Sequence, residues 1–228
     1  MVVEIGPGRG ALTEYLLRRT RVKAIELDPE LVLELRDRWG TTNNFELVQG
    51  SALNVDWSGW GPGAMAGNLP YYVATAIICR FLRNPGQLSS GVFLIQKEVA
   101  DRITAQPGTR DYGYLSVECQ YLAQATILFR VAPGAFRPPP KVDSAVVRFT
   151  PHQPPPEDID KFLAFASACF RQKRKMLRNN LLGLYPRDRI DALAEAGARA
   201  EQLPISDLLR IYRQLSQPLS QPLSQPNA

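Results

Sequence analysis

The tetrapeptide at residues 68–71, Asn-Leu-Pro-Tyr, combines the residue types that chemistry on the exocyclic amine of a nucleobase requires. An adenine N6 amine is a poor nucleophile because its lone pair is delocalised into the ring. The amide oxygen of Asn68 and the backbone carbonyl of Leu69 can each accept an N6 hydrogen, which localises the lone pair for in-line attack on a sulfonium methyl. Tyr71 offers an aromatic face to the base, and Pro70 stiffens the loop. We therefore predict a methyl-transfer site that needs no strong general base.

A simple turn is the competing interpretation of this tetrapeptide, because Asn, Gly and Pro dominate turns and Gly67 precedes it. A second aromatic residue favours the site. Phe136 lies in a proline-rich, basic loop at residues 132–142, where we predict that it closes over the other face of an extruded base. Arg137 and Lys141 of the same loop are predicted RNA contacts.

A glycine-rich turn lies upstream, with Gly6, Gly8 and Gly10 between an apolar run and a helix-like segment. Gly6 and Gly8 together with Ala11 also satisfy the dinucleotide pattern G-x-G-x-x-(G/A), with Glu26 placed to hold a ribose hydroxyl pair. The pattern alone does not decide between two cofactors. Glu4, before the first glycine, disfavours the pyrophosphate of NAD but suits the ammonium group of S-adenosylmethionine.

Each predicted cofactor contact has an alternative explanation. Glu4 could be a buried carboxylate that accepts hydrogen bonds from backbone amides. Glu26 could be a surface acid, although it ends an apolar strand at the sheet edge where open α/β sheets bind ligands. Ser51 and Ala52 follow the next strand, where a polar side chain can hydrogen-bond the cofactor adenine, but Ser51 could instead cap the following segment.

Composition excludes several classes of protein. The single histidine, His152, lies among prolines, and the three cysteines form no C-x-x-C pair, which argues against a His/Cys zinc site and against Ser-His or Cys-His catalysis. No apolar run approaches a membrane span and no signal peptide is recognisable, so a cytoplasmic protein with reduced thiols is expected. The 27 basic and 22 acidic residues give a formal charge of +5, which modestly favours a polyanionic partner.

The basic residues are concentrated in one run. Five of them fall within eight residues that contain no acid, in a segment predicted to be helical: Arg171, Lys173, Arg174, Lys175 and Arg178. A solvated helix face and a nucleic-acid contact are about equally good interpretations of such a run taken alone.

Strand-like and helix-like segments alternate along the first 150 residues, which predicts an α/β fold with a parallel, doubly wound sheet. The predicted strands are 22–27, 45–49, 64–67 and 92–96, and helices are expected at 29–39, 73–82 and 115–124. Two further strands, 126–131 and 144–149, are joined by a loop short enough to make them antiparallel neighbours.

A proline-rich segment at residues 151–156 marks the predicted domain boundary. Residues 1–150 are assigned to the α/β domain and residues 151–215 to a small helical, RNA-binding domain. Its predicted helices are 159–170, 173–184, 187–196 and 205–215. Residues 216–228 repeat Leu-Ser-Gln-Pro and are predicted to be a disordered low-complexity tail.

From residue 1 to about residue 215 the chain resembles the ribosomal RNA adenine dimethyltransferases of the KsgA/RsmA family. The proline-lysine block at residues 136–148 is the most specific of the matching motifs. The others are at residues 3–8, 25–28, 67–71, 96–99, 112–116 and 172–175.

The resemblance implies a seven-stranded, Rossmann-like class I methyltransferase sheet with a C-terminal helical domain. It also implies that S-adenosylmethionine methylates N6 twice on each of two neighbouring adenosines near the 3′ end of small-subunit ribosomal RNA. Carried over by position, the cofactor lies against Gly6, Gly8, Glu26, Ser51 and Asn68. The target amine lies at Asn68, Leu69 and Tyr71, and Phe136 stacks on the base.

Three departures from the family pattern affect these expectations. Ser51 stands where Asp is usual, which predicts a weaker contact to the cofactor adenine, and Tyr72 stands where Asn is frequent. The printed sequence begins at the first sheet strand, whereas relatives carry an upstream segment that helps to enclose the cofactor. On this basis the pocket is expected to be open on one side and to bind S-adenosylmethionine weakly.

Other functions remain in competition with the small-subunit methyltransferase. One is an RNA-binding assembly factor whose catalysis is weakened. Two further alternatives are a large-subunit RNA methyltransferase that confers macrolide resistance, against which the proline-lysine block argues, and an NAD enzyme, against which residues 68–71 argue.

Overall fold

The computed structural model describes residues 1–217, which divide into two compact units. Met1–Ala105 and Leu115–Glu157 form an α/β unit, and Gln106–Tyr114 joins residues 158–217 in a helical unit. The domain boundary predicted from the sequence is at residue 150, with residues 106–114 in the first domain. The place of these residues in the helical unit was not predicted. Of the predicted tail, residues 218–228 lie outside the described part of the chain.

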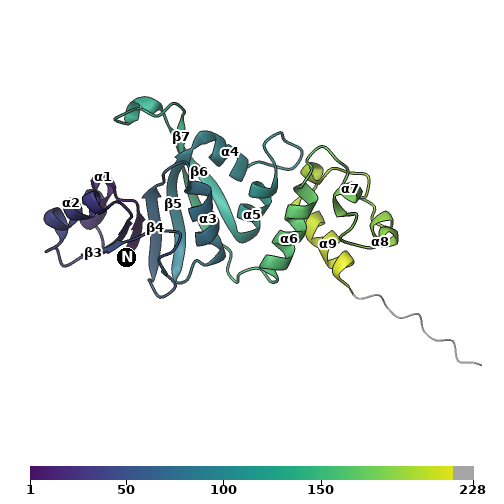
Figure 1. Cartoon of the computed structure of the whole chain (residues 1–228), viewed down its shortest axis with the longest axis horizontal. Helices are drawn as coiled ribbons and strands as arrows, with labels where there is room; N and C mark the ends of the chain where they lie inside the picture. The colour runs from purple at the N-terminus through teal and green to yellow at the C-terminus, as the bar shows by residue number, and fades with distance from the viewer. Residues whose placement is uncertain (218–228) are drawn as a thin grey trace, which may run out of the picture. The chain divides into compact units, whose positions relative to one another are not determined.

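The α/β unit is built on a seven-stranded sheet of order β3-β2-β1-β4-β5-β7-β6 (Figure 1). The first five strands of this order are parallel, whereas β7 runs antiparallel to both β5 and β6. The strands are β1 (Val2–Ile5), β2 (Val22–Glu26), β3 (Phe45–Gln49), β4 (Gly63–Asn68), β5 (Leu88–Gln96), β6 (Ala123–Val131) and β7 (Ser144–Pro151). The predicted α/β class, the seven strands and the antiparallel final pair are confirmed.

Five helices connect these strands: α1 (Ala11–Leu17), α2 (Pro29–Trp39), α3 (Ala74–Arg83), α4 (Lys97–Ile103) and α5 (Tyr114–Leu122). Helix α2 begins directly after β2 because Asp28 caps it, accepting a hydrogen bond from the Glu30 amide at 2.9 Å, and Pro29 occupies the first turn. Sequence analysis did not anticipate α4, whose seven residues follow β5 without a turn.

The core of the α/β unit lies where the apolar stripe of α3 meets the central strands. Ile78 and Phe81 of α3 are fully buried, and the Phe81 ring packs edge-on against Phe93 of β5 with centroids 5.9 Å apart. Phe93 in turn lies 6.0 Å from Phe149 of β7. This packing joins α3 to the central strands of the sheet.

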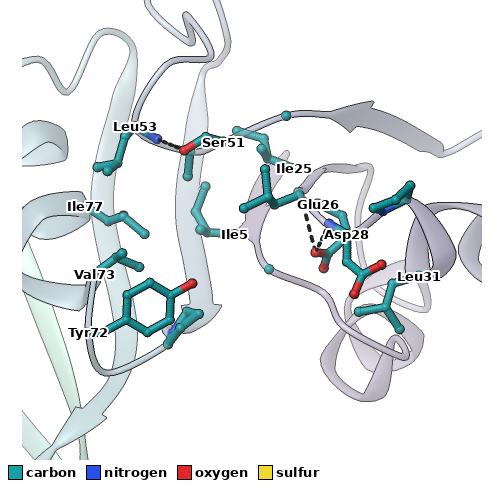
Figure 2. A pocket seen from close by; sticks show the side chains of 16 residues that line it. Ile5, Ile25, Glu26, Asp28, Leu31, Ser51, Leu53, Tyr72, Val73 and Ile77 are labelled. Carbon is teal, nitrogen blue, oxygen red and sulfur yellow. Dashed lines mark hydrogen bonds between the residues drawn. The ribbon is translucent and has the colours of Figure 1, made fainter.

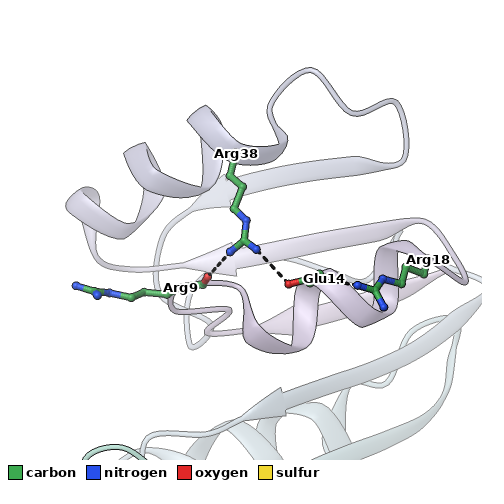
Figure 3. A network of polar contacts seen from close by, with 4 residues as sticks. All are labelled: Arg9, Glu14, Arg18 and Arg38. Atoms are coloured by element: carbon green, nitrogen blue, oxygen red, sulfur yellow. Dashed lines mark hydrogen bonds and ion pairs between the residues drawn. The ribbon is translucent and has the colours of Figure 1, made fainter.

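Helices α1 and α2 are joined by exposed polar contacts around Arg38 (Figure 3). Its guanidinium donates to the Glu14 carboxylate at 3.1 Å and to the Arg9 carbonyl at 3.3 Å, and Arg18 also donates to Glu14, at 2.7 Å. Exposed ion pairs of this kind each contribute little stability. The contact to Arg9 nevertheless ties α2 to the glycine-rich turn.

The helical unit contains α6 (Ile159–Phe170), α7 (Leu177–Leu181), α8 (Arg187–Asp191) and α9 (Ile205–Ser216). Phe162 and Phe165 of α6 are buried and pack against Tyr212 of α9, with centroids 5.8 and 5.6 Å apart. The expected helix at 173–184 is shorter than predicted and the one at 187–196 ends at Asp191. No helix among residues 1–217 is long and apolar enough to cross a membrane.

Candidate functional site

A cavity of about 540 Å³ lies at the carboxyl edge of the sheet, between the ends of β1, β2 and β3 and the loop that follows β4 (Figure 2). Its wall is largely apolar, and its charged side chains are both acidic. The lining residues are Ile5, Gly6, Ile25, Glu26, Leu27, Asp28, Pro29, Leu31, Gly50, Ser51, Ala52, Leu53, Pro70, Tyr72, Val73 and Ile77. Because no Lys or Arg lines it, the cavity suits a nucleoside without a pyrophosphate better than it suits NAD.

Gly6 of the glycine-rich turn lines the cavity, whereas Gly8 does not. Gly6 and Gly8 have φ values of 63° and 59°, in the left-handed region that residues with a side chain rarely adopt. The Gly6 amide donates to the Ile25 carbonyl at 2.9 Å, which continues the β1–β2 pairing into the turn. The turn can therefore bring bare backbone against a ligand. Gly10, also predicted here, begins α1 and does not line the cavity.

Glu26 is the organising side chain of the cavity. It is 7% exposed and accepts three backbone hydrogen bonds, from Leu27 at 2.8 Å, from Asp28 at 3.0 Å and from Gly8 at 3.0 Å. Two of these donors meet Oε1 and one meets Oε2, so Oε2 retains capacity for a further donor. Glu26 is thus held rigidly at the cavity wall and is not a free surface acid.

Glu4 is also buried, but it does not line the cavity. Its carboxylate accepts a hydrogen bond from the Thr13 hydroxyl at 2.7 Å, and burial raises its pKa from 4.5 to about 7. This is the buried carboxylate considered from the sequence, although its donor is a side chain of α1. A contact between Glu4 and a cofactor stays a prediction.

Ser51 and Ala52 line the cavity from the segment after β3. The Ser51 hydroxyl also accepts a hydrogen bond from the Leu53 amide at 3.2 Å, so it shapes the local turn as the alternative explanation proposed. The two roles are compatible, because the turn presents Ser51 and Leu53 to the same cavity (Figure 2).

The Asn-Leu-Pro-Tyr tetrapeptide leads from the end of β4 to the cavity mouth. Asn68 is exposed, and its side chain makes no hydrogen bond to any residue within 1–217. Leu69 is buried and its amide donates to the Leu94 carbonyl at 3.2 Å. The Tyr71 hydroxyl lies 2.8 Å from that of Ser144, at the start of β7. The segment is therefore an anchored loop with one free polar side chain.

The loop between β6 and β7 carries Phe136, Arg137 and Lys141. A short 3₁₀ turn, Pro133–Ala135, precedes Phe136, whose side chain is half-buried. Arg137 and Lys141 are exposed and have no polar partner in the described part of the chain. The end of this loop meets the tetrapeptide through Ser144 and Tyr71, but a position of Phe136 beside Asn68 stays a prediction.

The basic run at residues 171–178 is not on a continuous helix, which corrects the sequence interpretation. Residues 171–175 form a turn, and only Arg178 belongs to α7. Asn180 closes this turn, because its buried side chain donates to the Cys169 carbonyl at 2.7 Å and accepts from the Gln172 amide at 3.2 Å. Arg171 donates to the Asn180 carbonyl at 2.9 Å.

The members of the basic run at residues 171–178 differ in their partners. Lys173 donates to the Arg110 carbonyl at 2.5 Å and lies 3.6 Å from the Glu201 carboxylate, both within the helical unit. Arg174, Lys175 and Arg178 are exposed, and their side chains make no hydrogen bond or ion pair to residues that the structure describes. These last three cations can therefore bind an anionic partner without giving up a hydrogen bond within the protein.

Several residues that line the cavity were not among the site residues predicted from the sequence. Leu27 and Asp28 directly follow the strand that ends at Glu26, so their position after a strand was a usable signal. Tyr72 is 85% exposed, and Figure 2 shows its ring at the cavity beside Val73. Ile77, one turn further along α3, carried no signal distinguishable from that of a core residue.

Comparison with known proteins supplies the family context. The family model described as "Ribosomal RNA adenine dimethylase" matches residues 1–217. A protein of Acidobacterium capsulatum named "Ribosomal RNA small subunit methyltransferase A" is 42% identical, covering 94% of this chain and 81% of that protein. A protein of the same name from Pseudomonas fluorescens is also 42% identical, covering 94% and 83%.

Two solved structures share the architecture. A dimethyladenosine transferase from Plasmodium falciparum superposes with a TM-score of 0.80 at 25% identity, covering 92% of this chain and 87% of that one. The 23S rRNA methyltransferase ErmE superposes with a TM-score of 0.70 at 29% identity, covering 95% and 91%.

Proposed function

The chain belongs to the ribosomal RNA adenine dimethylase family of methyltransferases, and we propose that it dimethylates N6 of two adjacent adenosines near the 3′ end of small-subunit ribosomal RNA. The cofactor of this family is S-adenosylmethionine. One observation carries the proposal: a nucleoside-sized cavity with Glu26 fixed by three amides adjoins Pro70 of the Asn-Leu-Pro-Tyr loop.

The residues present fit S-adenosylmethionine, which supplies an electrophilic methyl group when bound. Gly6 and Gly8 offer backbone without side chains, and the remaining acceptor capacity of Glu26 suits the ribose hydroxyls. Ser51 and Ala52 lie where the adenine would be recognised. Gly10, Glu4 and Asn68 complete the proposed cofactor contacts, Glu4 because its carboxylate suits the ammonium group.

The substrate amine is proposed to lie at Asn68 and the Leu69 carbonyl, which accept its two hydrogens and localise its lone pair. Asn68 is suited to this role because its side chain is exposed and makes no hydrogen bond to the described residues. The hydrogen bond between Tyr71 and Ser144 fixes the ring on which the base stacks, and Pro70 limits the freedom of the loop. Phe136 is proposed to cover the opposite face of the base.

RNA is proposed to be held through exposed cations of both units. Those of the α/β unit are Arg137 and Lys141, and those of the helical unit are Arg171, Lys173, Arg174, Lys175 and Arg178. On this proposal residues 1–150 act as the catalytic domain and residues 151–215 bind RNA. A monomer acting in the cytoplasm on a pre-ribosomal particle during ribosome biogenesis completes the proposal. The assembly-factor alternative is not favoured, since the relatives are named methyltransferases.

The test uses this chain, methyl-labelled S-adenosylmethionine and small ribosomal subunits prepared from cells that lack the modification. Mass spectrometry of nuclease digests reads the product. We expect N6,N6-dimethyladenosine in a fragment from the 3′ end of the small-subunit RNA and none in large-subunit RNA. Label confined to large-subunit RNA, or absent from both, would contradict the proposal.

A further inference from the structure

The segment after β3 forms one wall of the cavity without regular secondary structure. Ser51, Ala52 and Leu53 line the cavity from this segment. Two amides of the segment, those of Asn54 and Val55, turn back to the Ser51 carbonyl at 2.9 and 3.0 Å. The remaining backbone carbonyls of this segment need hydrogen-bond donors from other elements, because unpaired carbonyls would leave the segment without a fixed conformation.

Arg80 of α3 supplies those partners. Its Nη1 donates to the Ala52 carbonyl at 2.9 Å, and its Nη2 donates to the Val55 carbonyl at 2.8 Å. The same guanidinium lies 3.8 Å from the centre of the Trp57 ring. Arg80 therefore contacts the segment after β3 at three residues, Ala52, Val55 and Trp57. The planar guanidinium can make all three contacts at once, whereas a lysine ammonium cannot fully reproduce them.

Trp57 holds the Arg80 guanidinium in place. Its side chain is 2% exposed, and its indole Nε1–H donates to the Asn84 carbonyl at 3.0 Å, just beyond α3. The wall segment is thus fastened to α3 both through Arg80 and through Trp57. Helix α3 also presents Ile77 to the cavity, one turn before Arg80.

We infer that Arg80 is a positioning residue for cofactor binding: it holds the adenine-side wall, residues 51–53, at a fixed distance from Ile77. Arg80 does not line the cavity, so it acts through the wall and not by contact with a ligand. The inference rests on the proposed function, because it takes the cavity to be the cofactor site. No role in the proposed amine chemistry is assigned to Arg80.

Replacing Arg80 by Met removes all three contacts while keeping an unbranched side chain, and replacing it by Lys keeps the charge and one donor direction. We expect Arg80→Met to weaken S-adenosylmethionine binding by about tenfold and Arg80→Lys by about threefold, because the site must be ordered as the ligand binds. The turnover number at saturating cofactor should change less than twofold, so the defect falls on KM.

Arg83 provides the matched control, one turn further along the same helix. It pairs with the Glu118 carboxylate of α5 at 2.7 Å, so this ion pair joins α3 to a different element from the wall segment. Arg83→Met should lower the melting temperature comparably to Arg80→Met but leave cofactor affinity within about twofold of the parent protein. Calorimetric titrations are run below the melting temperature of every variant.

A second ligand locates the defect. 5′-Methylthioadenosine has the adenine and ribose but lacks the amino acid group, so a wall defect should weaken it by the same factor as S-adenosylmethionine. Equal loss for both ligands, with rescue by Lys, supports the inference. Unchanged affinity in Arg80→Met, or an equal loss in Arg83→Met, overturns it. If the parent protein binds neither ligand, the proposed function itself fails.

Should Arg80→Met not fold, Arg80→Lys and Trp57→Phe carry the same test. Phenylalanine keeps a ring under the guanidinium but loses the bond to the Asn84 carbonyl. Both variants should weaken the two ligands by a few-fold while the turnover number at saturation is kept. Retained affinity in both would contradict the inference.

Discussion

The cavity of the α/β unit and the basic run of the helical unit, residues 171–178, are built in opposite ways. In the cavity, the charged group Glu26 is almost fully buried and has three backbone donors. In the basic run at residues 171–178, the side chains of Arg174, Lys175 and Arg178 are exposed and have no polar partner in the part of the chain that the structure describes. Hydrogen bonds hold the buried carboxylate of the cavity in place, whereas no such bonds hold these three cations.

This difference follows from what each region is proposed to recognise. A small ligand is recognised by groups at fixed positions, so a side chain with several hydrogen bonds loses little freedom when the ligand binds. A phosphate backbone is recognised mainly through its charge, and long flexible cations can follow it without an imposed geometry. Substitutions in the two regions should therefore change different measurements.

Asn68→Ala should give the largest effect and should leave RNA binding by the basic run unaffected. It removes the only side-chain acceptor of the proposed amine clamp, so the turnover number should fall by about 10²- to 10³-fold, as for loss of one preorganised transition-state hydrogen bond. RNA affinity, measured by fluorescence anisotropy, should be nearly unchanged. Turnover close to that of the parent protein would remove Asn68 from the mechanism.

Glu4 should make the α/β unit lose stability as pH rises towards neutrality. Burial raises the Glu4 pKa from 4.5 to about 7, so between these values the folded state binds more protons than the unfolded state. Stability should therefore fall through this window and level off above it, by roughly 2 to 3 kcal/mol.

The comparison protein for this prediction is Glu4→Gln, which has the same shape but does not titrate. Urea unfolding at pH 5 and pH 8 gives the two free energies of unfolding for each protein. The parent protein should lose more stability than Glu4→Gln between these pH values. Equal losses would show that Glu4 is ionised at both pH values.

Replacing Arg174, Lys175 and Arg178 by Gln tests the second region of the comparison, the basic run. RNA binding should weaken by about tenfold at moderate salt, and the slope of log affinity against log salt should flatten by up to about 2, from roughly 0.7 for each single-stranded phosphate contact. Cofactor affinity should not change. Lys161→Gln with Arg187→Gln, in the same unit, is the matched control. An unaltered slope in the triple variant would mark the run as a solvated surface.

The sequence predicted the order of the elements well, because strands and helices of the α/β unit carry distinct periodicities and are separated by turn residues. It did not predict helix α4, since Lys97 follows β5 without any turn signal. It also overextended the helix at 173–184. The buried amide of Asn180 closes the preceding turn through side-chain hydrogen bonds, and such long-range contacts leave no periodic trace.

The candidate site was predicted in kind but not in detail. Glu26 was placed at the sheet edge from its position after an apolar strand, and the structure puts it at the cavity. Its three backbone donors could not be foreseen, because they depend on how the glycine-rich turn folds over β2. The same holds for Arg80, whose contacts reach 25 and 28 residues back along the chain.

The central claim is that Glu26 and the surrounding cavity bind S-adenosylmethionine. Glu26→Gln tests it closely, because the amide keeps the shape but has one acceptor oxygen for three backbone donors, and its NH₂ group opposes one of them. Glu30→Gln, at an exposed position in the first turn of α2, is the matched control.

Isothermal titration of S-adenosylmethionine into the parent protein and these two variants is the most direct measurement. We expect one binding site per chain in the parent protein, unchanged affinity in Glu30→Gln, and affinity at least tenfold weaker in Glu26→Gln, or about 1.4 kcal/mol. Equal affinity in the parent protein and Glu26→Gln, or no binding by the parent protein at millimolar ligand, would contradict the account.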